Sequence, residues 1–199
     1  MCIRDRRRDG FVYRLGAALL VVESAEHAAA RGARAYGEIA GAATTNDAWH
    51  PIRQSGIGVV ECLEDALADA GLAPADVVHV NAHGSGTQLN DAVESDAIRT
   101  VFGEHRPSVT SIKRVTGHSL GGAGSFEAAA VLLSFEREAL PPAGIDVVLD
   151  PALDVDVVHG AARAWTPGPT ISNSFGLGGQ NGTIVLLSLI HISEPTRPY

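Results

Sequence analysis

The feature that most constrains the fold is an alternation of short apolar strands with helices through the middle of the chain. Helical spacing of apolar residues predicts one helix from Ser55 to Gly71 and another from Asp91 to Gly103. Compact apolar runs at 77–80 and 108–111 predict short buried strands. Because strands that alternate with helices form a sheet covered on both faces, the sequence predicts an α/β fold.

Further elements are expected on both sides of this region. The apolar run 16–23 has the composition of a buried strand, and 36–43 indicates a second one. The helix that contains 126–133 is apolar almost all round, so we expect it to be buried on most sides. Two last strands, 170–173 and 183–186, bracket a glycine-rich turn.

Three polar, glycine-rich loops interrupt this pattern, at 81–87, 113–124 and 173–182. The first loop directly follows a predicted buried strand and contains His83. Ligands of open α/β sheets bind at the carboxyl ends of strands, so His83 is expected at a binding edge. The second loop contains Lys113 and begins just before the apolar helix.

Charged groups and backbone donors suggest how these loops could act. Glu127 lies one turn into the apolar helix, and an isolated buried charge is too costly, so we expect it to pair with Lys113. The ordinary alternative is a carboxylate near the helix start that the helix dipole favours. The third loop contains Phe175 among glycines, and its exposed backbone N–H groups could receive an oxyanion.

Composition excludes several classes of protein. A formal net charge of −8 argues against a nucleic-acid or anionic-membrane surface. No apolar run approaches the roughly 18 residues of a membrane span. Besides Cys2, only Cys62 is present, in mid-helix without a glycine turn to expose it, and it is interpreted as structural. We therefore expect no metal cluster and a reducing, cytoplasmic setting.

The two ends of the sequence need a separate interpretation. The first five residues and residues 187–191 can be encoded by one short DNA sequence read on opposite strands. This coincidence favours translated sequencing adaptor at 1–6 and 187–199 over natural termini. On that interpretation, residues 7–186 are an internal piece of a longer protein.

The three loops together resemble those of the elongating β-ketoacyl-[acyl-carrier-protein] synthases. That family shows a His-Gly-Thr-x-Thr loop, a Lys-x-x-x-Gly-His loop and an Asn-Ser-Phe-Gly-Phe-Gly-Gly loop, in this order. The matching residues here are His83-Gly84-Ser85-Gly86-Thr87, Lys113-Arg114-Val115-Thr116-Gly117-His118 and Asn173-Ser174-Phe175-Gly176-Leu177-Gly178-Gly179. Leu177 replaces an aromatic residue of the family pattern, and Gln180 replaces a Thr or His.

The resemblance implies a thiolase-like fold, in which two βαβαβαββ halves pack together. Residues 7–45 would be the end of the N-terminal half, and residues 46–186 would be the C-terminal domain. The segment 9–12 resembles the one that leaves the N-terminal half.

The resemblance also implies roles for the loop residues. A cysteine would carry the acyl chain as a thioester, while His83 and His118 would hold the thioester oxygen of a malonyl group that loses carbon dioxide. Lys113, paired with Glu127, would fix the histidine loop. Because the chain lacks that cysteine, we expect it to be inactive by itself.

In the third loop, the resemblance implies that Phe175 is a gate beside the nucleophile and that its N–H contributes to an oxyanion hole, together with Asn173 and Gly176. Thr87, Asp91 and Glu94 would support the site. An ordinary alternative stays open for Asp91 and Glu94, which could be the N-cap and the capping-box partner of their helix.

The function implied is condensation of an acyl thioester with malonyl-carrier protein in fatty acid biosynthesis. The partner would be an acyl carrier protein bearing phosphopantetheine, the enzyme would be a homodimer, and it would need no metal or redox cofactor of its own. Two alternatives remain, a polyketide ketosynthase and a non-catalytic subunit of the chain-length-factor type. The retained His83, Lys113 and His118 speak against the second.

Overall fold

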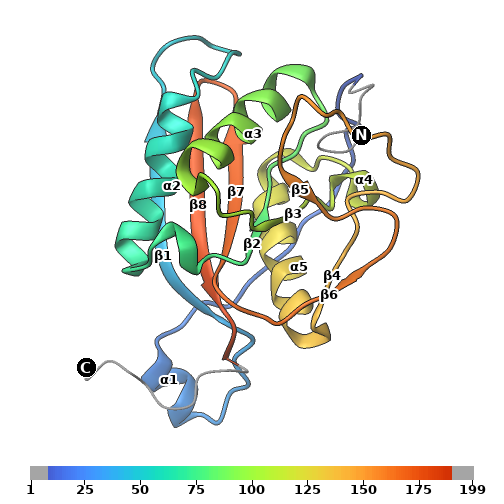
Figure 1. Cartoon of the computed structure of the whole chain (residues 1–199). Helices are drawn as coiled ribbons and strands as arrows, with labels where there is room; N and C mark the ends of the chain where they lie inside the picture. Colours follow the sequence, from blue (N-terminus) through green and yellow to red (C-terminus); the bar gives the residue numbers. More distant parts are fainter. Residues whose placement is uncertain (1–8, 190–199) are drawn as a thin grey trace.

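The computed structural model describes residues 9–189 (Figure 1). The interpretation of 1–6 and 187–199 as adaptor therefore lies outside the described residues, except at 187–189. The helices and strands are α1 (Ala25–Ala30), β1 (Glu38–Asn46), α2 (Ile57–Ala70), η1 (Pro74–Asp76), β2 (His79–Asn81), α3 (Gln88–Phe102), β3 (Ser108–Thr110), α4 (Lys113–Thr116), η2 (Leu120–Gly122), α5 (Ala123–Arg137), β4 (Ala139–Leu140), β5 (Asp156–Val157), β6 (Arg163–Ala164), β7 (Thr170–Gly176) and β8 (Gln180–Leu187).

Six strands form one mixed sheet in the order β1-β8-β7-β2-β3-β5. Its centre is parallel, because β2 pairs in parallel with both β7 and β3, and β3 pairs in parallel with β5. Strand β8 runs antiparallel between β1 and β7. The carboxyl ends of β2, β3 and β7 therefore point the same way, and each leads into one of the three glycine-rich loops.

Helices cover both faces of this sheet (Figure 1). Alternate residues of β8 show the two layers, since side chains of a strand point to opposite faces. Val185 belongs to the core cluster that contains Leu63 of α2 and Ile98 of α3. Leu186 packs in a second cluster with Phe135 of α5. The predicted α/β architecture with a two-sided sheet is present.

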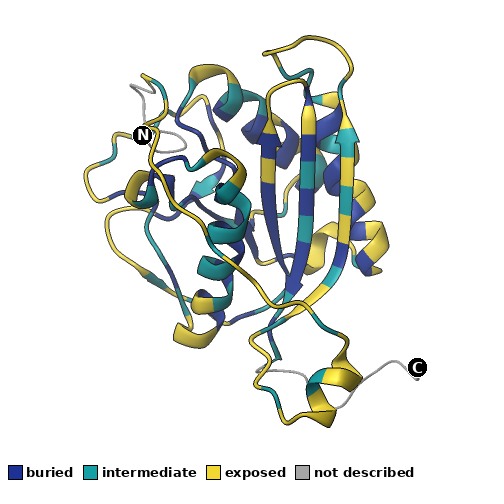
Figure 2. Cartoon of the chain, turned by 180° about the vertical axis from the view of Figure 1, so that it is seen from behind, coloured by how far each residue is buried: buried dark blue, intermediate teal, exposed yellow. Residues whose placement is uncertain are grey.

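The apolar run 16–23 is not a buried strand, contrary to expectation. It is extended backbone with no strand beside it among the described residues, and it crosses the back of the molecule as an exposed ribbon (Figure 2). Leu19 is 97% exposed and Val21 is 85% exposed. Burial of a strand requires a neighbouring element as well as apolar composition.

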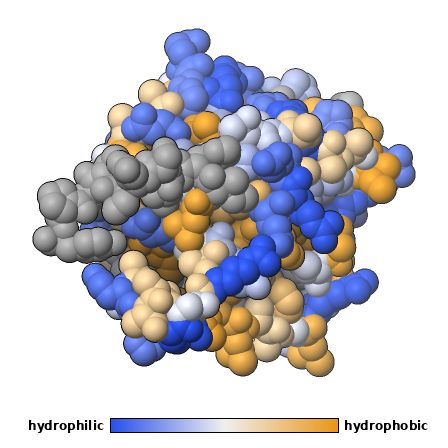
Figure 3. Space-filling view, turned by 90° about the horizontal axis from the view of Figure 1, so that it is seen from below, coloured by the Kyte–Doolittle hydropathy of each residue, from blue (hydrophilic) through white to orange (hydrophobic). Residues whose placement is uncertain are grey.

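Apolar side chains, mixed with hydrophilic ones, also reach the surface seen from below (Figure 3).

Two other elements differ from the sequence-based expectation. Helix α5 buries Val131 and Phe135 but leaves Leu133 53% exposed, because in residues 9–189 it packs mainly through its sheet-facing side. Strand β1 pairs with β8 from Glu38 to Asn46. The expected division between residues 45 and 46 therefore cuts through a strand of the six-stranded sheet.

Candidate active site

The loop after β2 is held by a buried carboxylate from α3. Glu94 Oε1 accepts a hydrogen bond from the His83 N–H at 2.8 Å, and Oε2 accepts one from the Gly84 N–H at 2.9 Å. Burial raises the pKa of Glu94, and these N–H groups oppose the rise. Glu94 thus holds the His83 loop, which corrects the capping-box alternative.

Helix α3 begins at Gln88 rather than at Asp91. Its N-cap is Thr87, whose hydroxyl accepts the N–H of Asn90 at 3.2 Å. Asp91 Oδ1 accepts the Gly86 N–H at 3.1 Å. Asp91 is therefore not the cap but, like Thr87, holds the end of the loop that starts the helix.

A buried ion pair lies beside His83. Lys113 Nζ bonds the carboxylate of Glu127, and both side chains are almost completely buried. The same ammonium donates to the backbone oxygen of His83 at 2.5 Å and lies 3.4 Å from its Nδ1. Burial raises the pKa of Glu127 to about 7, and the charge of Lys113 counteracts that rise. The expected pairing of these two residues is present.

The two histidines of the first and second loops come together in space. The ring centroids of His83 and His118 lie 5.2 Å apart, with an interplanar angle of 76°. His118 follows Gly117, whose φ of 71° lies in the region that favours glycine. The loops after β2 and β3 therefore bring both imidazoles to the carboxyl edge of the sheet, where an open α/β fold binds ligands.

Backbone N–H groups fix the tautomer of both rings. The Phe175 N–H donates to His83 Nδ1 at 3.2 Å, and the Leu120 N–H donates to His118 Nδ1 at 3.2 Å. A ring nitrogen that accepts a hydrogen bond carries no proton, so the proton of each neutral ring is on Nε2. Burial and then the charge of Lys113 lower the pKa of both histidines. The site thus holds two neutral Nε2–H donors at neutral pH.

Phe175 is placed differently from expectation. Its N–H is engaged by His83, so it is not free to bind an oxyanion. Its side chain is buried, with the ring centroid 5.6 Å from that of His83, whereas Leu177 in the turn between β7 and β8 is 75% exposed. Sequence reasoning placed the oxyanion donor at Phe175 because it could not show which N–H groups the fold already uses.

The other two residues expected in the third loop have separate positions. Asn173 is completely buried, and its Nδ2 donates to Glu94 Oε1 at 3.2 Å. Gly176 is the last residue of β7 and pairs with Gln180 at the turn. Asn173 therefore contacts the support of the His83 loop, and Gly176 opens the turn that carries Leu177.

Sequence reasoning missed that segment 9–14 contacts His118. The His118 N–H donates to the Val12 oxygen at 2.8 Å, and the Arg14 N–H donates to the His118 oxygen at 3.2 Å. The Phe11 ring lies edge-on to the His118 ring, with centroids 5.2 Å apart. Only the family resemblance of 9–12 could have signalled this contact, because no periodicity or polar cluster marks the segment.

Asp47 is a second residue that sequence reasoning missed. Its Oδ1 accepts from Asn181 Nδ2 at 3.0 Å, and its Oδ2 accepts from the Ser55 N–H at 2.6 Å. Its own N–H donates to the Gly179 oxygen at 2.9 Å. Asp47 thus joins the loop 47–55 to the β7–β8 turn, and a single Asp in a polar loop gives no sequence signal for such a contact.

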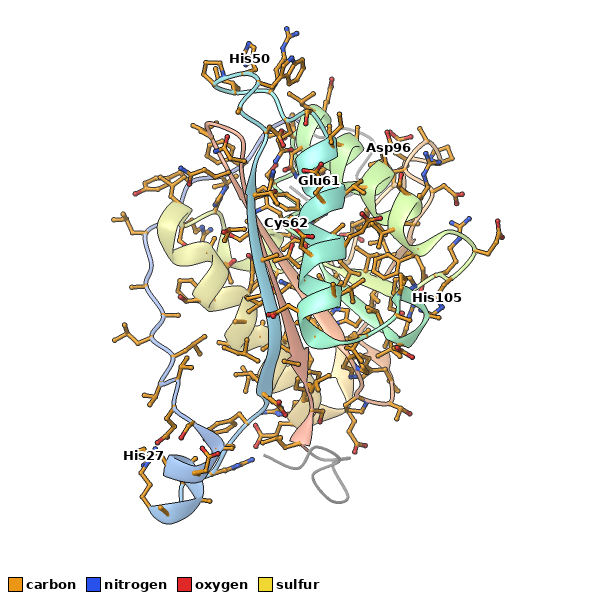
Figure 4. All side chains as sticks on the ribbon, turned by 90° about the vertical axis from the view of Figure 1, so that its left-hand side faces the viewer. His27, His50, Glu61, Cys62, Asp96 and His105 are labelled. Carbon is orange, nitrogen blue, oxygen red and sulfur yellow. The ribbon has the colours of Figure 1, made fainter. Side chains whose placement is uncertain are left out.

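The site around His83 and His118 does not include Cys62 or three other histidines. His27 lies on α1, His50 in the loop after β1, and His105 beyond α3 (Figure 4). Cys62 is completely buried in α2, and its Sγ contacts the Ala43 oxygen at 3.4 Å. Burial also raises the pKa of the Cys62 thiol, so it is not placed as an accessible nucleophile.

Residues 9–189 contain neither a cluster of metal ligands nor a membrane-spanning helix. No three His, Cys, Asp or Glu side chains in that range gather as a metal ion requires. No helix in it has the length and apolar character needed to cross a membrane.

Known protein families provide the context for this geometry. The family model of the β-ketoacyl synthase C-terminal domain matches residues 36–144, more than half of the chain. This chain belongs to the β-ketoacyl synthase family. The matched range contains His83, Lys113, His118 and Glu127, whereas the β7–β8 turn lies beyond it.

Curated β-ketoacyl synthases match most of the chain. The 3-oxoacyl-[acyl-carrier-protein] synthase 2 of Mycobacterium tuberculosis (strain ATCC 25618 / H37Rv) is 43% identical over 182 residues, which cover 90% of this chain and 44% of that protein. The synthase of the same name from Synechocystis sp. is 42% identical over 185 residues, with the same coverage. The chain spans a little less than half the length of these relatives.

Solved ketosynthase structures have the same fold. A type II polyketide acyl-carrier protein in complex with its ketosynthase, AntDE:AntF, matches with a TM-score of 0.88 and 34% identity, over 94% of this chain and 47% of that one. A β-ketoacyl synthase from Burkholderia phymatum STM815 matches with a TM-score of 0.80 and 34% identity, over 84% and 41%. The expected family and thiolase-like fold are thus confirmed.

Proposed function

We propose that the whole protein is a 3-oxoacyl-[acyl-carrier-protein] synthase and that this chain supplies the donors for decarboxylation of the malonyl thioester. The observation that carries the proposal is the pair of neutral imidazoles, His83 and His118, whose rings lie 5.2 Å apart with their protons on Nε2. The relatives that share most of the chain bear this name.

In the proposed reaction, the bond between the malonyl carboxylate and its methylene carbon breaks, and carbon dioxide leaves. The bonding electrons pass to the thioester carbonyl, which becomes an enolate, so negative charge develops on oxygen. Two fixed N–H donors stabilise this charge more strongly than the neutral ground state, and each typically contributes a factor of about 10² to 10³. The enolate carbon then attacks the acyl thioester, and the cysteine thiolate leaves.

The rest of the assembly also belongs to the proposal. Because Cys62 is buried, the acyl-bearing cysteine would come from the part of the relatives that this chain does not match. An acyl carrier protein would deliver malonyl and acyl groups on phosphopantetheine, and the synthase would work as a cytoplasmic homodimer. The reaction needs no metal or redox cofactor, since decarboxylation itself generates the carbon nucleophile.

A polyketide ketosynthase is the second candidate. An ishigamide ketosynthase/chain length factor structure matches with a TM-score of 0.88 and 34% identity. The higher identity of 43% to the synthase 2 relatives favours fatty acid synthesis. A non-catalytic chain-length factor would have no need of enolate donors, so the geometry of His83 and His118 disfavours it.

A chimera tests the proposal. Residues 9–186 would replace the matching region of the Mycobacterium tuberculosis synthase, which would supply the remaining part. We expect the chimera to condense acyl and malonyl groups, and His83→Ala or His118→Ala to slow decarboxylation by about 10² to 10³. His105→Ala is the control, because it lies outside the site. A folded chimera that acylates its cysteine but does not decarboxylate malonyl thioester would contradict the proposal.

A further inference from the structure

A continuous chain of buried hydrogen bonds joins β8 to the His83 loop. Thr183 Oγ1 donates to Asn173 Oδ1 at 3.0 Å, and Asn173 Nδ2 donates to Glu94 Oε1 at 3.2 Å. Glu94 in turn accepts the His83 N–H at 2.8 Å. The side chains of Thr183, Asn173 and Glu94 are almost completely buried. The Thr183 hydroxyl on β8 is thus linked through Asn173 and Glu94 to the loop that carries His83.

The Asn173 amide has two orientations, and the observed one suits both of its neighbours. Its Nδ2 donates to the Glu94 carboxylate, whereas a half-turn of the amide would place two acceptors, Oδ1 and Oε1, against each other. In the observed orientation, Oδ1 requires a donor, and Thr183 supplies it. The two residues are directly opposite in the β7–β8 ladder, and the branched threonine side chain has restricted rotamers, so the donor is held in place.

Strand β7 also acts on His83 by a second route. Phe175 lies two residues after Asn173 in β7, and its N–H donates to His83 Nδ1 at 3.2 Å. Glu94 meanwhile holds the His83 backbone N–H. A displacement of Asn173 relative to Glu94 would therefore change both the position of the loop and the bond that keeps the His83 proton on Nε2.

We propose that the Thr183 hydroxyl positions His83 by fixing the Asn173 amide against Glu94. Thr183 is a positioning residue, since it acts through Asn173, Glu94 and the backbone of β7. The effect of Thr183 on catalysis rests on the proposed function, whereas its effect on the position of His83 does not.

Hydrogen exchange and nitrogen NMR of the 199-residue chain test the proposal. Thr183→Val removes the hydroxyl with little change of shape. We expect the amides of His83, Gly84 and Phe175 to exchange at least about tenfold faster relative to the core amide of Val109, because a buried acceptor has lost its donor. We also expect the ring nitrogen signals of His83 to shift.

Two further substitutions at the same position separate the hydroxyl from packing. Thr183→Ser keeps the hydroxyl and should retain the original exchange rates and ring signals. Thr183→Ala removes the hydroxyl without adding a second methyl group to the strand, so it replaces Thr183→Val if that variant does not fold.

Matched controls test whether the effect is specific. Thr170→Val removes another buried hydroxyl from β7, one that donates to the Gly168 oxygen at 3.1 Å, and it should leave the His83 signals in place. Cys62→Ala controls for a buried thiol whose pKa the Thr183 hydroxyl influences. The proposal is wrong if Thr183→Val leaves the local exchange and ring signals unchanged, or if either control reproduces its effect. Neither readout involves turnover, so a folded, acylated chimera that fails to decarboxylate malonyl thioester would refute the proposed function without affecting this result.

Discussion

At the scale of single residues, two buried histidines that lie four positions apart, His79 and His83, have different surroundings and different roles. His83 has its Nδ1 bonded to a backbone N–H and lies against the His118 ring. His79 is buried in β2, where its Nε2 lies 2.8 Å from Thr110 Oγ1 and its ring packs edge-on against Trp165. Neither contact provides a carboxylate that could stabilise a protonated His79 ring. His79 is therefore a neutral core residue.

His79 should make the folded chain sensitive to acid. Burial lowers its folded-state pKa from 6.5 to about 3. In the unfolded chain, the His79 ring takes up a proton near its ordinary pKa of 6.5. The contribution of His79 to the free energy of unfolding is therefore fully present above pH 6.5, and it is lost as the pH falls toward the folded-state pKa of about 3. Between about pH 7 and pH 5, this group should remove about 2 kcal/mol from the free energy of unfolding.

Urea unfolding at the two pH values measures this loss. His79→Gln cannot titrate but keeps a polar group near Thr110, so its pH dependence should be smaller than that of the parent by that amount. An equal loss of stability in both proteins would show that His79 does not titrate in the expected way.

At the scale of elements, loops that are far apart in sequence hold one another through a few side chains. The turn between β7 and β8 is bound to the loop 47–55 through Asp47, which contacts Asn181, Ser55 and Gly179. The turn carries Leu177 and directly follows the residue that bonds His83. The stability of this contact should therefore control how freely the turn moves.

Asp47→Ala should loosen the turn. Removing the carboxylate leaves the Ser55 N–H and the Asn181 amide without these acceptors, at a cost of roughly 1–3 kcal/mol for local opening. Hydrogen exchange at 176–182 should increase accordingly. Asp76→Ala, which removes a carboxylate that accepts the Ala73 N–H at 2.8 Å, is the control. Equal exchange at 176–182 in Asp47→Ala and the parent would count against the coupling.

Much of the arrangement could be predicted from local sequence signals. Strand–helix alternation and glycine-rich loops predicted the two-sided sheet, and the placement of loops after β2 and β3 indicated where His83 and His118 would lie. The start of α3 could not be assigned, because Thr87 and Asp91 are both good caps and only the loop geometry distinguishes them. The use of the Phe175 N–H depends on tertiary contact, which no local pattern encodes.

At the scale of the whole molecule, an apolar ribbon lies on the surface of the described residues. Leu19 and Val21 are nearly fully exposed there, and the backbone of 16–23 has no strand beside it in that part of the chain. Contiguous exposed apolar groups promote association, and unpaired extended backbone provides an edge for it. We expect the chain by itself to self-associate through this ribbon.

Leu19→Lys together with Val21→Lys should reduce self-association without destabilising the fold. Substitutions at such exposed positions usually change stability by no more than about 0.5 kcal/mol. Light scattering should show a smaller average mass for the double variant, and urea unfolding should be unchanged. Leu133→Lys, a half-exposed position on α5, tests whether any added charge is sufficient. The same reduction from that control would show that the ribbon is not the contact.

The proton of His83 is directed by the main chain of β7, since its partner is the N–H of Phe175 rather than any side chain. Every amino acid except proline offers that group. The donor that sets the tautomer is therefore independent of the side chain at 175, although that side chain is itself buried beside the His83 ring. Any substitution at 175 other than proline keeps the donor, and it acts on the imidazole only through packing and the position of the strand.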